Sequence, residues 1–493
     1  MTQAEIDRLR ALPLEPALHV VDGRRVAASD GGTMPVVSPI DGRQLTTCAR
    51  GTRSDAEAAI TAARRAFDDG RWSGLAPAAR KKVLLRWADL IEARGVALPV
   101  LGVREKGPDI GMALKAEPAS AVATLRYYAE AIDKLAGEIA PTDPAFLGLV
   151  HREPVGVVGA IVPWNFPLMI GAWKFAPALA AGCTMVLKPA ETACLTLLRI
   201  AELGLEAGLP PGVFNVVTGE GAVVGAAIAE SMQVDVLVFT GSGATGRRLM
   251  EAAARSNLKR VYLELGGKSP NIVFADAPDL DEAAKVAAHG IFRNSGQVCI
   301  AGSRILVERG IHAAFVEKLA AHAAAMKVGD PLDLSTQAGA VNSDRQLRQN
   351  LAFVEEARGA GRQVIGGARI LEDTGGFYMS PAIVADAAPE DRVYRHEVFG
   401  PVVTVTPFDT EAEAVALANG TDYGLAAAVW TANLSRAHRM VRAIRAGLVH
   451  VNTYGGSDLT VPLGGVGQSG NGHDKSLHAF DKFLNLKTAW VKL

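Results

Sequence analysis

The chain has 493 residues, more than one hydrophobic core normally serves, so we expect two or three domains. Its 51 basic residues nearly balance its 52 acidic ones, which argues against nucleic acid as a partner and favours small metabolites or nucleotides. The four cysteines include no C-x-x-C pair and the histidines no H-E-x-x-H motif. We therefore expect no disulfide framework, no metal site and a reducing, cytoplasmic compartment.

Neither secretion nor membrane insertion is expected. Residues 1–14 lack the apolar stretch of a signal peptide. Residues 155–173 carry no charge and are long enough to cross a bilayer, but Pro163, Asn165 and Pro167 interrupt the stretch in its middle. This pattern predicts a buried strand followed by a turn.

The first third of the chain predicts small strands and then helices. Residues 19–50 alternate short apolar runs with Asp-Gly turns, which indicates hairpins in a peripheral ribbon. From residue 54 to about residue 135 the apolar residues recur at helical spacing, and Ser54 with Glu57 fits a capping box. Residues 139–151 form a turn-bounded, partly polar stretch that we expect to project as an arm.

Strands and helices alternate from residue 155 onward, which predicts an α/β fold. Alternation of this kind requires crossover connections, so the strands should lie parallel, with helices on both faces and ligands at the carboxyl ends of the strands. A second alternating region, from residue 269 to about residue 474, predicts a second α/β domain. The expected strands of the first region are 155–162, 184–187, 213–217, 236–239 and 260–263. In the second region we expect helices near 281–293 and 311–328 and strands near 305–306 and 402–405.

A dinucleotide fingerprint follows one of these strands. Residues 241–246 read G-x-G-x-x-G and open a predicted helix, which is the context that the fingerprint requires. The fingerprint also expects an acidic residue about 20 residues later to hold the ribose. Taken literally, this assigns the ribose to Glu264, at the end of the next strand.

Cys299 is the candidate nucleophile. It lies among the small residues of the stretch 294–303 (NSGQVCIAGS), which leave its sulfur approachable. A thiol attacks as its thiolate, so a catalytic cysteine needs neighbours that remove a proton or stabilise negative charge. The alternative is a buried structural cysteine.

Five motifs read together resemble the aldehyde dehydrogenase superfamily over essentially the whole chain. They are residues 163–167 (PWNFP), 188–191 (KPAE), 263–268 (LELGGK), 296–299 (GQVC) and 397–401 (EVFGP). The resemblance implies a Rossmann-like NAD-binding domain (1–135 and 156–265), a catalytic domain (266–476) and a small β oligomerisation element (136–155 and 477–493). Residues 456–462 and 468–476 resemble most the branch that oxidises aminoaldehydes, including γ-glutamyl-γ-aminobutyraldehyde dehydrogenases.

The resemblance also implies roles for individual residues, and one of them conflicts with the fingerprint. Cys299 attacks the aldehyde, the Asn165 amide and the Cys299 backbone N–H stabilise the oxyanion, and Glu264 activates the water that cleaves the thioester. Lys188 and Glu191 then hold the ribose in place of Glu264. The implied catalytic residues are Cys299, Glu264, Asn165 and Lys188.

NAD is the expected cofactor, because a carboxylate at Glu191 would repel the 2′-phosphate of NADP; use of NADP is left open. Glu397 resembles the family's ligand of the nicotinamide ribose, and Phe399 the ring beside the nicotinamide. The implied cofactor-binding residues are Ile161, Pro163, Trp164, Lys188, Glu191, Gly241, Ser242, Gly246, Leu265, Glu397 and Phe399.

A polar aldehyde or aminoaldehyde is the expected substrate. The resemblance places Arg293 and Asp458 at a tunnel to Cys299, where a charge must be solvated, paired or bound to ligand. Either the two residues pair with each other, or Asp458 receives a substrate ammonium, or Arg293 receives a substrate carboxylate as in a semialdehyde. The implied wall of the tunnel is otherwise apolar and comprises Phe166, Met169, Ile170, Trp173, Val298 and Ile300.

Two alternatives to hydrolytic aldehyde oxidation remain. A CoA-acylating enzyme does not need a carboxylate to activate water, and Glu264 argues against it. A catalytically silent structural homologue is disfavoured by the intact Cys299, Asn165 and Glu264. The last ten residues, 484–493, predict an apolar edge strand that pairing with another subunit would cover, so we expect a homo-oligomer, either a dimer or a homotetramer.

Overall fold

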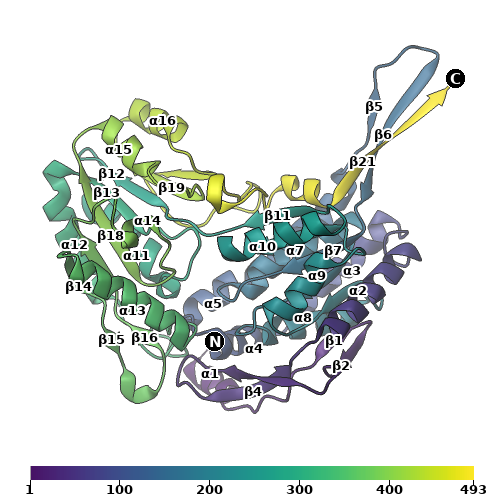
Figure 1. Ribbon diagram of the computed structural model, residues 1–493, viewed down its shortest axis with the longest axis horizontal. Helices are drawn as coiled ribbons and strands as arrows, with labels where there is room; N and C mark the ends of the chain where they lie inside the picture. The colour runs from purple at the N-terminus through teal and green to yellow at the C-terminus, as the bar shows by residue number, and fades with distance from the viewer. Residues whose placement is uncertain (1) are drawn as a thin grey trace.

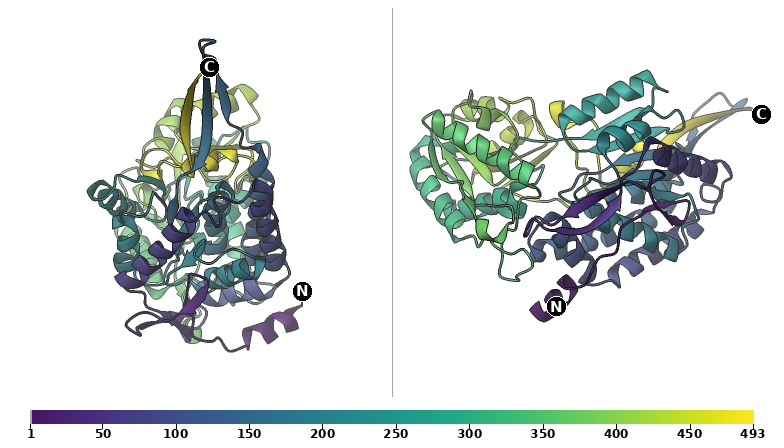
Figure 2. Two further views of the ribbon diagram at one scale, coloured as in Figure 1. Left: turned by 90° about the vertical axis from the view of Figure 1, so that its right-hand side faces the viewer. Right: turned by 60° about the horizontal axis from the view of Figure 1, so that its bottom comes forward.

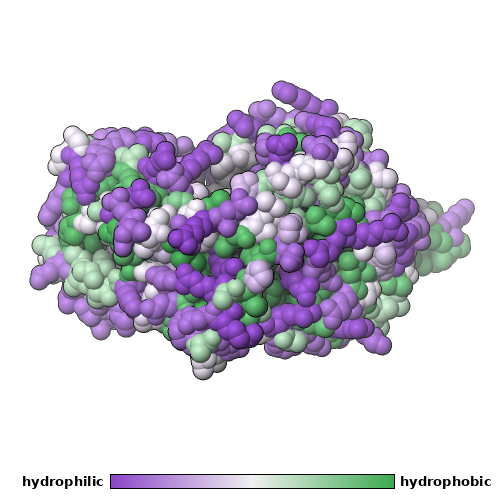
Figure 3. All heavy atoms as spheres, turned by 90° about the horizontal axis from the view of Figure 1, so that it is seen from below, coloured by the Kyte–Doolittle hydropathy of each residue, from purple (hydrophilic) through white to green (hydrophobic). Residues whose placement is uncertain are grey.

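The computed structural model describes residues 2–493 and shows two α/β lobes with a narrow ribbon projecting from one of them (Figure 1). The lobe built from the first part of the chain carries the ribbon, and the second lobe lies on its other side (Figures 1 and 2). Seen from below, hydrophilic side chains alternate with apolar ones over the surface (Figure 3). No helix among the described residues is both long enough and apolar enough to cross a membrane.

A seven-stranded sheet forms the centre of the first lobe, in the order β11-β10-β7-β8-β9-β1-β2. Its five strands from β11 to β9 are parallel and mostly buried, as expected of valine-rich strands covered on both faces. The strands are β1 (His19–Val21), β2 (Arg24–Val26), β7 (Val157–Ile161), β8 (Thr184–Lys188), β9 (Phe214–Val216), β10 (Val236–Thr240) and β11 (Arg260–Glu264).

The N-terminal strands differ from the expected peripheral ribbon. Strand β1 pairs antiparallel with β9, so β1 and β2 extend the main sheet. The reason is the complete burial of Val20 and His19, which gives β1 a place in the core. Only β3 (Thr33–Val37) and β4 (Gln44–Ala49) form a separate hairpin.

Helices cover both faces of this sheet. The capping box of the first long helix, α2 (Arg53–Asp68), consists of Thr52 and Asp55, so the predicted box of Ser54 and Glu57 is wrong by two residues. Asp55 accepts the Thr52 backbone N–H and also the Ser29 N–H, a tertiary contact that favours this register. The other helices of the lobe are α1 (Gln3–Arg10), α3 (Pro77–Glu92), α4 (Ala97–Lys106), α5 (Ile110–Ala116), α6 (Pro118–Ala131), α7 (Pro167–Ala181), α8 (Leu195–Ala207), α9 (Ala226–Glu230) and α10 (Gly243–Arg255).

The second lobe repeats the α/β design around a seven-stranded sheet in the order β14-β17-β18-β13-β12-β19-β20. All its pairs are parallel except β14 with β17. The strands are β12 (Pro270–Val273), β13 (Arg304–Glu308), β14 (Gln363–Gly366), β17 (Ala382–Ala385), β18 (Val402–Phe408), β19 (Ala426–Trp430) and β20 (Leu448–Val451), beside the hairpin β15 (Arg369–Ile370) with β16 (Tyr378–Met379). The helices are α11 (Leu280–Phe292), α12 (His312–Ala325), α13 (Asp344–Gly359), α14 (Arg392–Arg395), α15 (Glu411–Ala418) and α16 (Leu434–Ala443).

The projecting ribbon joins distant parts of the chain. Strand β21 (Leu484–Lys492) pairs antiparallel along its whole length with β6 (Phe146–Pro154), which also pairs with β5 (Glu138–Ala140) (Figures 1 and 2). Trp490 stacks on Phe146 with 5.2 Å between ring centroids, yet it remains 59% exposed. The outer edge of β21 therefore presents apolar side chains to the surroundings.

Candidate active site

Cys299 follows a tightly wound loop at the end of α11. Asn294, Ser295 and Gly296 all have positive φ, at 50°, 52° and 72°. A Cβ on Gly296 would lie 1.9 Å from the Gly400 carbonyl oxygen, so only glycine fits there. Backbone strain of this kind persists where the surrounding structure enforces it, and it is typical of functional sites.

The Gln297 side chain fixes this loop from within. Its amide nitrogen donates to the Asn294 carbonyl at 2.9 Å, and its amide oxygen accepts the Asn342 backbone N–H at 2.8 Å. Gln297 is almost fully buried, so both bonds are shielded from water. The loop is thus anchored to the second lobe immediately before Cys299.

Two cavities meet at Cys299. One, of about 250 Å³, is predominantly apolar, and the other, of about 550 Å³, opens beside the parallel sheet of the first lobe. Cys299 and Ile170 line both of them. A ligand in either cavity can therefore approach the same sulfur.

The free thiol is held protonated. Burial and then the carboxyl groups of Glu397 and Glu264 raise the pKa of Cys299 to about 12, although the N–H groups of Ile300 and Cys299 donate toward the sulfur and act in the opposite direction. A thiol with this pKa needs a base, or the loss of a neighbouring negative charge, before it attacks. The charges of Glu397 and Glu264 therefore influence the ionisation of the thiol.

Glu264 ends β11 and lies beside a buried charge cluster. Burial, and then the charge of Asp474, raise its pKa well above the usual range. Asp474 accepts hydrogen bonds from both Lys174 and Lys482, and all three of these side chains are almost fully buried. Glu264 itself lines neither cavity, and its Oε1 has no hydrogen-bond partner among the described residues. A carboxyl group whose pKa is raised in this way is a candidate for proton exchange during a reaction.

Sequence reasoning missed the Lys174, Asp474 and Lys482 cluster, although a signal was present. Lys174 is the one charged residue in α7, a helix that is otherwise apolar on all sides. A lone charge in such a helix must be paired once buried.

Asn165 is a buried residue in the wall of the larger cavity. It is 3% exposed, lines the larger cavity together with Cys299, and donates from Nδ2 to the Gln297 carbonyl at 3.0 Å. A side-chain amide carries two N–H donors, so one remains for a ligand at Cys299.

The larger cavity contains most of the predicted cofactor residues. Pro163, Trp164, Gly241, Ser242, Leu265, Glu397 and Phe399 all line it. Ile161, Lys188, Glu191 and Gly246 do not; Gly246 instead packs α10 against Leu263 and Leu265. Three further lining residues, Gly243, Ala244 and Gly266, belong to the motifs 241–246 and 263–268 without being among the predicted cofactor residues. Lining residues that the sequence did not single out are Thr240, Arg247, Gln346, Gln349, Phe353, Arg392, His396 and Tyr423.

The glycine-rich turn leads into the N-terminus of α10 at the wall of the larger cavity. A Cβ on Gly241 would lie 2.5 Å from the Phe239 ring, and Ser242 caps the N-terminus of α10. The free N–H groups at a helix N-terminus attract anions. Thr240 Oγ1, in the same wall, is buried without a partner among the described residues. These features fit a dinucleotide.

Lys188 and Glu191 form a matched pair at the end of β8. The Lys188 ammonium donates to the Glu191 carboxylate at 2.9 Å, and the same oxygen accepts the Gly221 N–H at 2.7 Å. Lys188 pairs in register with Ile161 of β7, at the carboxyl edge of the sheet. A donor and an acceptor held side by side suit vicinal hydroxyl groups.

The Glu397 carboxyl group packs closely against the loop after β11, because this loop has glycine at positions 266 and 267. Its Oε1 accepts the Gly267 N–H at 3.0 Å, and a Cβ on Gly266 would lie 2.0 Å from its Oε2. Burial raises the pKa of Glu397 to about 7. Phe399, with φ of 57°, packs edge-on against Trp164 at the rim of the same cavity.

The smaller cavity contains seven of the predicted substrate residues, namely Phe166, Met169, Ile170, Trp173, Arg293, Val298 and Ile300. Asp458 differs from expectation and is not part of the lining. Its exposed carboxylate accepts the Thr460 N–H and hydroxyl at 2.8 and 2.6 Å, which turns it outward. No ion pair joins it to Arg293 within residues 2–493. Lining residues missed from the sequence are Met112, Ala116, Ser120, Gly456, Ser457, Leu459, Leu463 and Lys475.

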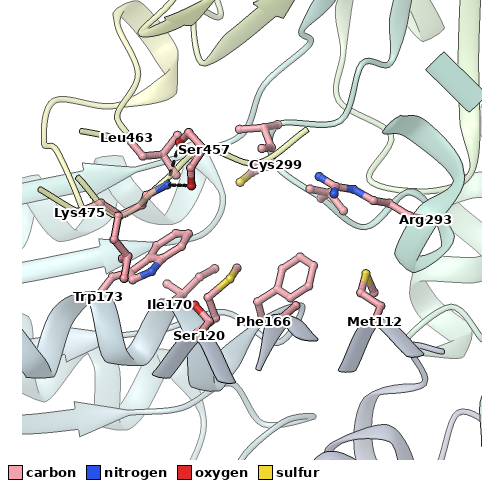
Figure 4. A pocket seen from close by; sticks show the side chains of 16 residues that line it. Met112, Ser120, Phe166, Ile170, Trp173, Arg293, Cys299, Ser457, Leu463 and Lys475 are labelled. Carbon is pink, nitrogen blue, oxygen red and sulfur yellow. Dashed lines mark hydrogen bonds between the residues drawn. The ribbon is translucent and has the colours of Figure 1, made fainter. Parts of the chain in front are cut away.

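Two cations face each other across this cavity. Figure 4 shows Arg293 on one side and Lys475 on the other, with Cys299 between them and Phe166 opposite the sulfur. Lys475 donates to the Ser457 carbonyl and hydroxyl at 2.7 and 2.8 Å. Burial lowers the pKa of Lys475 to about 8.

A cysteine set between a nucleotide cleft and an apolar cavity defines a cysteine-dependent oxidoreductase. The chain belongs to the aldehyde dehydrogenase family, since the sequence model described as "Aldehyde dehydrogenase family" matches residues 26–489. The predicted family and fold class are therefore confirmed. Among the described residues no three potential metal ligands gather into a site.

Individual relatives match over nearly the full chain. The chain is 46% identical over 488 residues to the NADP/NAD-dependent aldehyde dehydrogenase PuuC of Escherichia coli (strain K12), covering 99% of this chain and 98% of that protein. It is 43% identical over 478 residues to the aminoacetaldehyde dehydrogenase of Pseudomonas aeruginosa, with coverages of 97% and 96%. The crystal structure of the gamma-glutamyl-gamma-aminobutyraldehyde dehydrogenase from Burkholderia cenocepacia J2315 has a TM-score of 0.98 and 50% identity over 100% of both chains.

Proposed function

We propose that this enzyme oxidises a polar aldehyde to the carboxylic acid with NAD, through a thioester on Cys299. The observation that carries the proposal is the position of Cys299 in the lining of both cavities. An aldehyde in the smaller cavity and a cofactor in the larger one then meet at a single sulfur.

The side chains divide the chemistry between them. The Cys299 thiol first gives its proton to water, and the thiolate Sγ then attacks the aldehyde carbon. The free N–H of the Asn165 amide donates to the oxygen that becomes negative. NAD bound in the larger cavity supplies the acceptor for the hydride. Glu264 takes a proton from the water that cleaves the thioester. Two buried carboxyl groups with raised pKa act on Cys299. Glu264 is the one whose Oε1 has no hydrogen bond among the described residues, whereas Glu397 Oε1 accepts the Gly267 N–H.

NAD is favoured over NADP. Glu191 lies at the end of β8 as a carboxylate already paired with Lys188, and a 2′-phosphate there would meet its negative charge. The name of PuuC includes both cofactors, which supports dual use as the second possibility.

Steady-state kinetics test the proposal directly. Purified protein with NAD and a panel of aldehydes should produce NADH without added CoA. A strict requirement for CoA would favour the acylating alternative, and no NADH with any aldehyde would favour a silent homologue. The names of two relatives, which specify aminoacetaldehyde and gamma-glutamyl-gamma-aminobutyraldehyde, support polar aldehydes as the first panel.

A cytoplasmic homo-oligomer, either a dimer or a tetramer, is the proposed form. The exposed Leu486 and Trp490 of β21 give a second subunit an apolar strand edge to cover. All four cysteines are free, and three are buried, which suits a reducing compartment. Sedimentation velocity should show a species larger than the monomer, and a monomer at micromolar concentration would contradict this assembly.

A further inference from the structure

The charges in the smaller cavity are all of one sign. Arg293 and Lys475 are the charged members of its lining, and the part of the chain that the structure describes places no carboxylate there. The other lining residues are apolar, small or hydroxyl-bearing, apart from the reactive thiol and the Trp173 indole. A ligand in this cavity therefore meets a positive field within an apolar wall.

Arg293 has no counter-ion among the described residues. Its guanidinium enters the cavity from the start of the turn at 293–296 and faces Cys299 (Figure 4). Its Nε is buried without a hydrogen-bond partner among residues 2–493. Burial lowers the pKa of Arg293. The groups that would raise this pKa are Tyr454 and Cys299, and both are weak acids that are uncharged in their protonated forms. A guanidinium nevertheless stays protonated, so this site holds a buried charge that lacks an anion.

The other titratable neighbours of Arg293 add no negative charge. His289 and His450 both have a pKa lowered first by burial and further by Arg293, so they are neutral at physiological pH. Lys115, which also acts on His289, has the same sign as Arg293. The positive field at this end of the cavity is therefore uncompensated.

Lys475 differs, because its charge is already balanced. It donates two hydrogen bonds to Ser457, and the carboxylates of Asp458 and Asp474 act on its charge. The remaining polar group of the wall is the Trp173 indole N–H, which is 9% exposed as a residue and has no acceptor within the described residues. The cavity thus offers unpaired donors, and its described lining contains no carboxylate to pair with an ammonium group.

We infer that Arg293 binds a carboxylate at the far end of the aldehyde, so that the enzyme prefers a short ω-oxo acid to an aminoaldehyde. The inference rests on the proposed oxidation and narrows its substrate class. Guanidinium and carboxylate match in a two-bond fork, which gives both charge and orientation. Because Arg293 and Cys299 line the same small cavity, a chain of few carbons spans the two groups.

Matched substrates test the preference. We expect kcat/KM for 4-oxobutanoate to exceed that for butanal, and that for 4-aminobutanal, by at least tenfold. In Arg293→Met the KM for 4-oxobutanoate should rise at least tenfold. The KM for butanal should change much less. Wild-type protein that oxidises butanal or 4-aminobutanal as well as 4-oxobutanoate would overturn the inference. Equal losses for all substrates in Arg293→Met would also overturn it, since Arg293 would then act on the thiol.

A second measurement needs no dehydrogenase activity, so it separates this inference from the proposed function. Iodoacetate and iodoacetamide are similar in size and differ in charge, and both alkylate Cys299, whereas the other three cysteines are buried. With neither NAD nor aldehyde present, the iodoacetate-to-iodoacetamide rate ratio should fall at least fivefold in Arg293→Met, as expected from the loss of a nearby charge. Arg293→Lys should retain part of the ratio. The comparison variant Asp458→Asn removes a carboxylate that acts on Lys475, so it should not lower the ratio. A ratio unchanged in Arg293→Met would refute the anion site.

Discussion

Replacing Glu264 by glutamine isolates the second half of the reaction. The amide has nearly the same size as the carboxyl group, and Oε1 has no partner to lose within the described residues. Burial already favours the neutral form of Glu264, which is why its pKa is raised, so the variant should fold normally. What changes is the ability to accept a proton.

The size of the effect follows from that loss. A positioned general base contributes about 10²–10⁴-fold, so kcat should fall by that factor, or about 3–5 kcal/mol. A burst of one NADH per active site should remain, because the thioester forms before water is needed. The ionised form of Glu264 also raises the pKa of Cys299, so Glu264→Gln should speed alkylation of the thiol at a pH above the raised pKa of Glu264.

Stopped-flow absorbance of NADH across a range of pH measures these changes. In the wild type the base works only when deprotonated, so kcat should fall as the pH drops below the raised pKa of Glu264. Glu264→Gln should lose this dependence. If Glu264→Gln had a raised KM for NAD with a normal kcat, Glu264 would not be the base. It would instead be assigned to binding of the ribose, as the fingerprint predicts.

Three other variants probe the rest of the site. Asn165→Ala should lower kcat by about 10²–10³-fold with little change in Tm, and a large fall in Tm with a modest fall in kcat would assign it a structural role instead. Glu191→Thr should raise the NADP/NAD ratio of kcat/KM by removing the repelling carboxylate, and an unchanged ratio would count against the ribose assignment. Gly296→Ala should lower Tm and activity together, because its Cβ would lie 1.9 Å from the Gly400 oxygen, and a normal Tm would show that the loop can give way there.

Much of the fold could be predicted because buried parallel strands are short continuous apolar runs. The stretch 236–239, for example, became β10 with one added residue. The capping box failed because two overlapping patterns, at Thr52 and at Ser54, satisfy the same local rule. The contact from Ser29 to Asp55 decides between them, and no local pattern contains it. The domain boundaries remain predictions.

Within the site, the motifs predicted Cys299 and Asn165, and the structure brings both residues to the lining of the larger cavity. The motifs did not fix the direction of side chains in the loop near residue 458. Asp458 stands between two residues that line the cavity, but its bonds to Thr460 turn it outward. Lys475 enters the cavity from a backbone with φ of 64°, a conformation that its sequence does not indicate.

The central claim is that Cys299 forms the covalent intermediate. Cys299→Ala removes one sulfur next to both cavities, and the residues that line the larger cavity otherwise remain in place. We expect no NADH from any aldehyde, no burst, and binding of NAD within a few-fold of wild type by calorimetry. Turnover of aldehyde by Cys299→Ala at a wild-type rate would contradict the account.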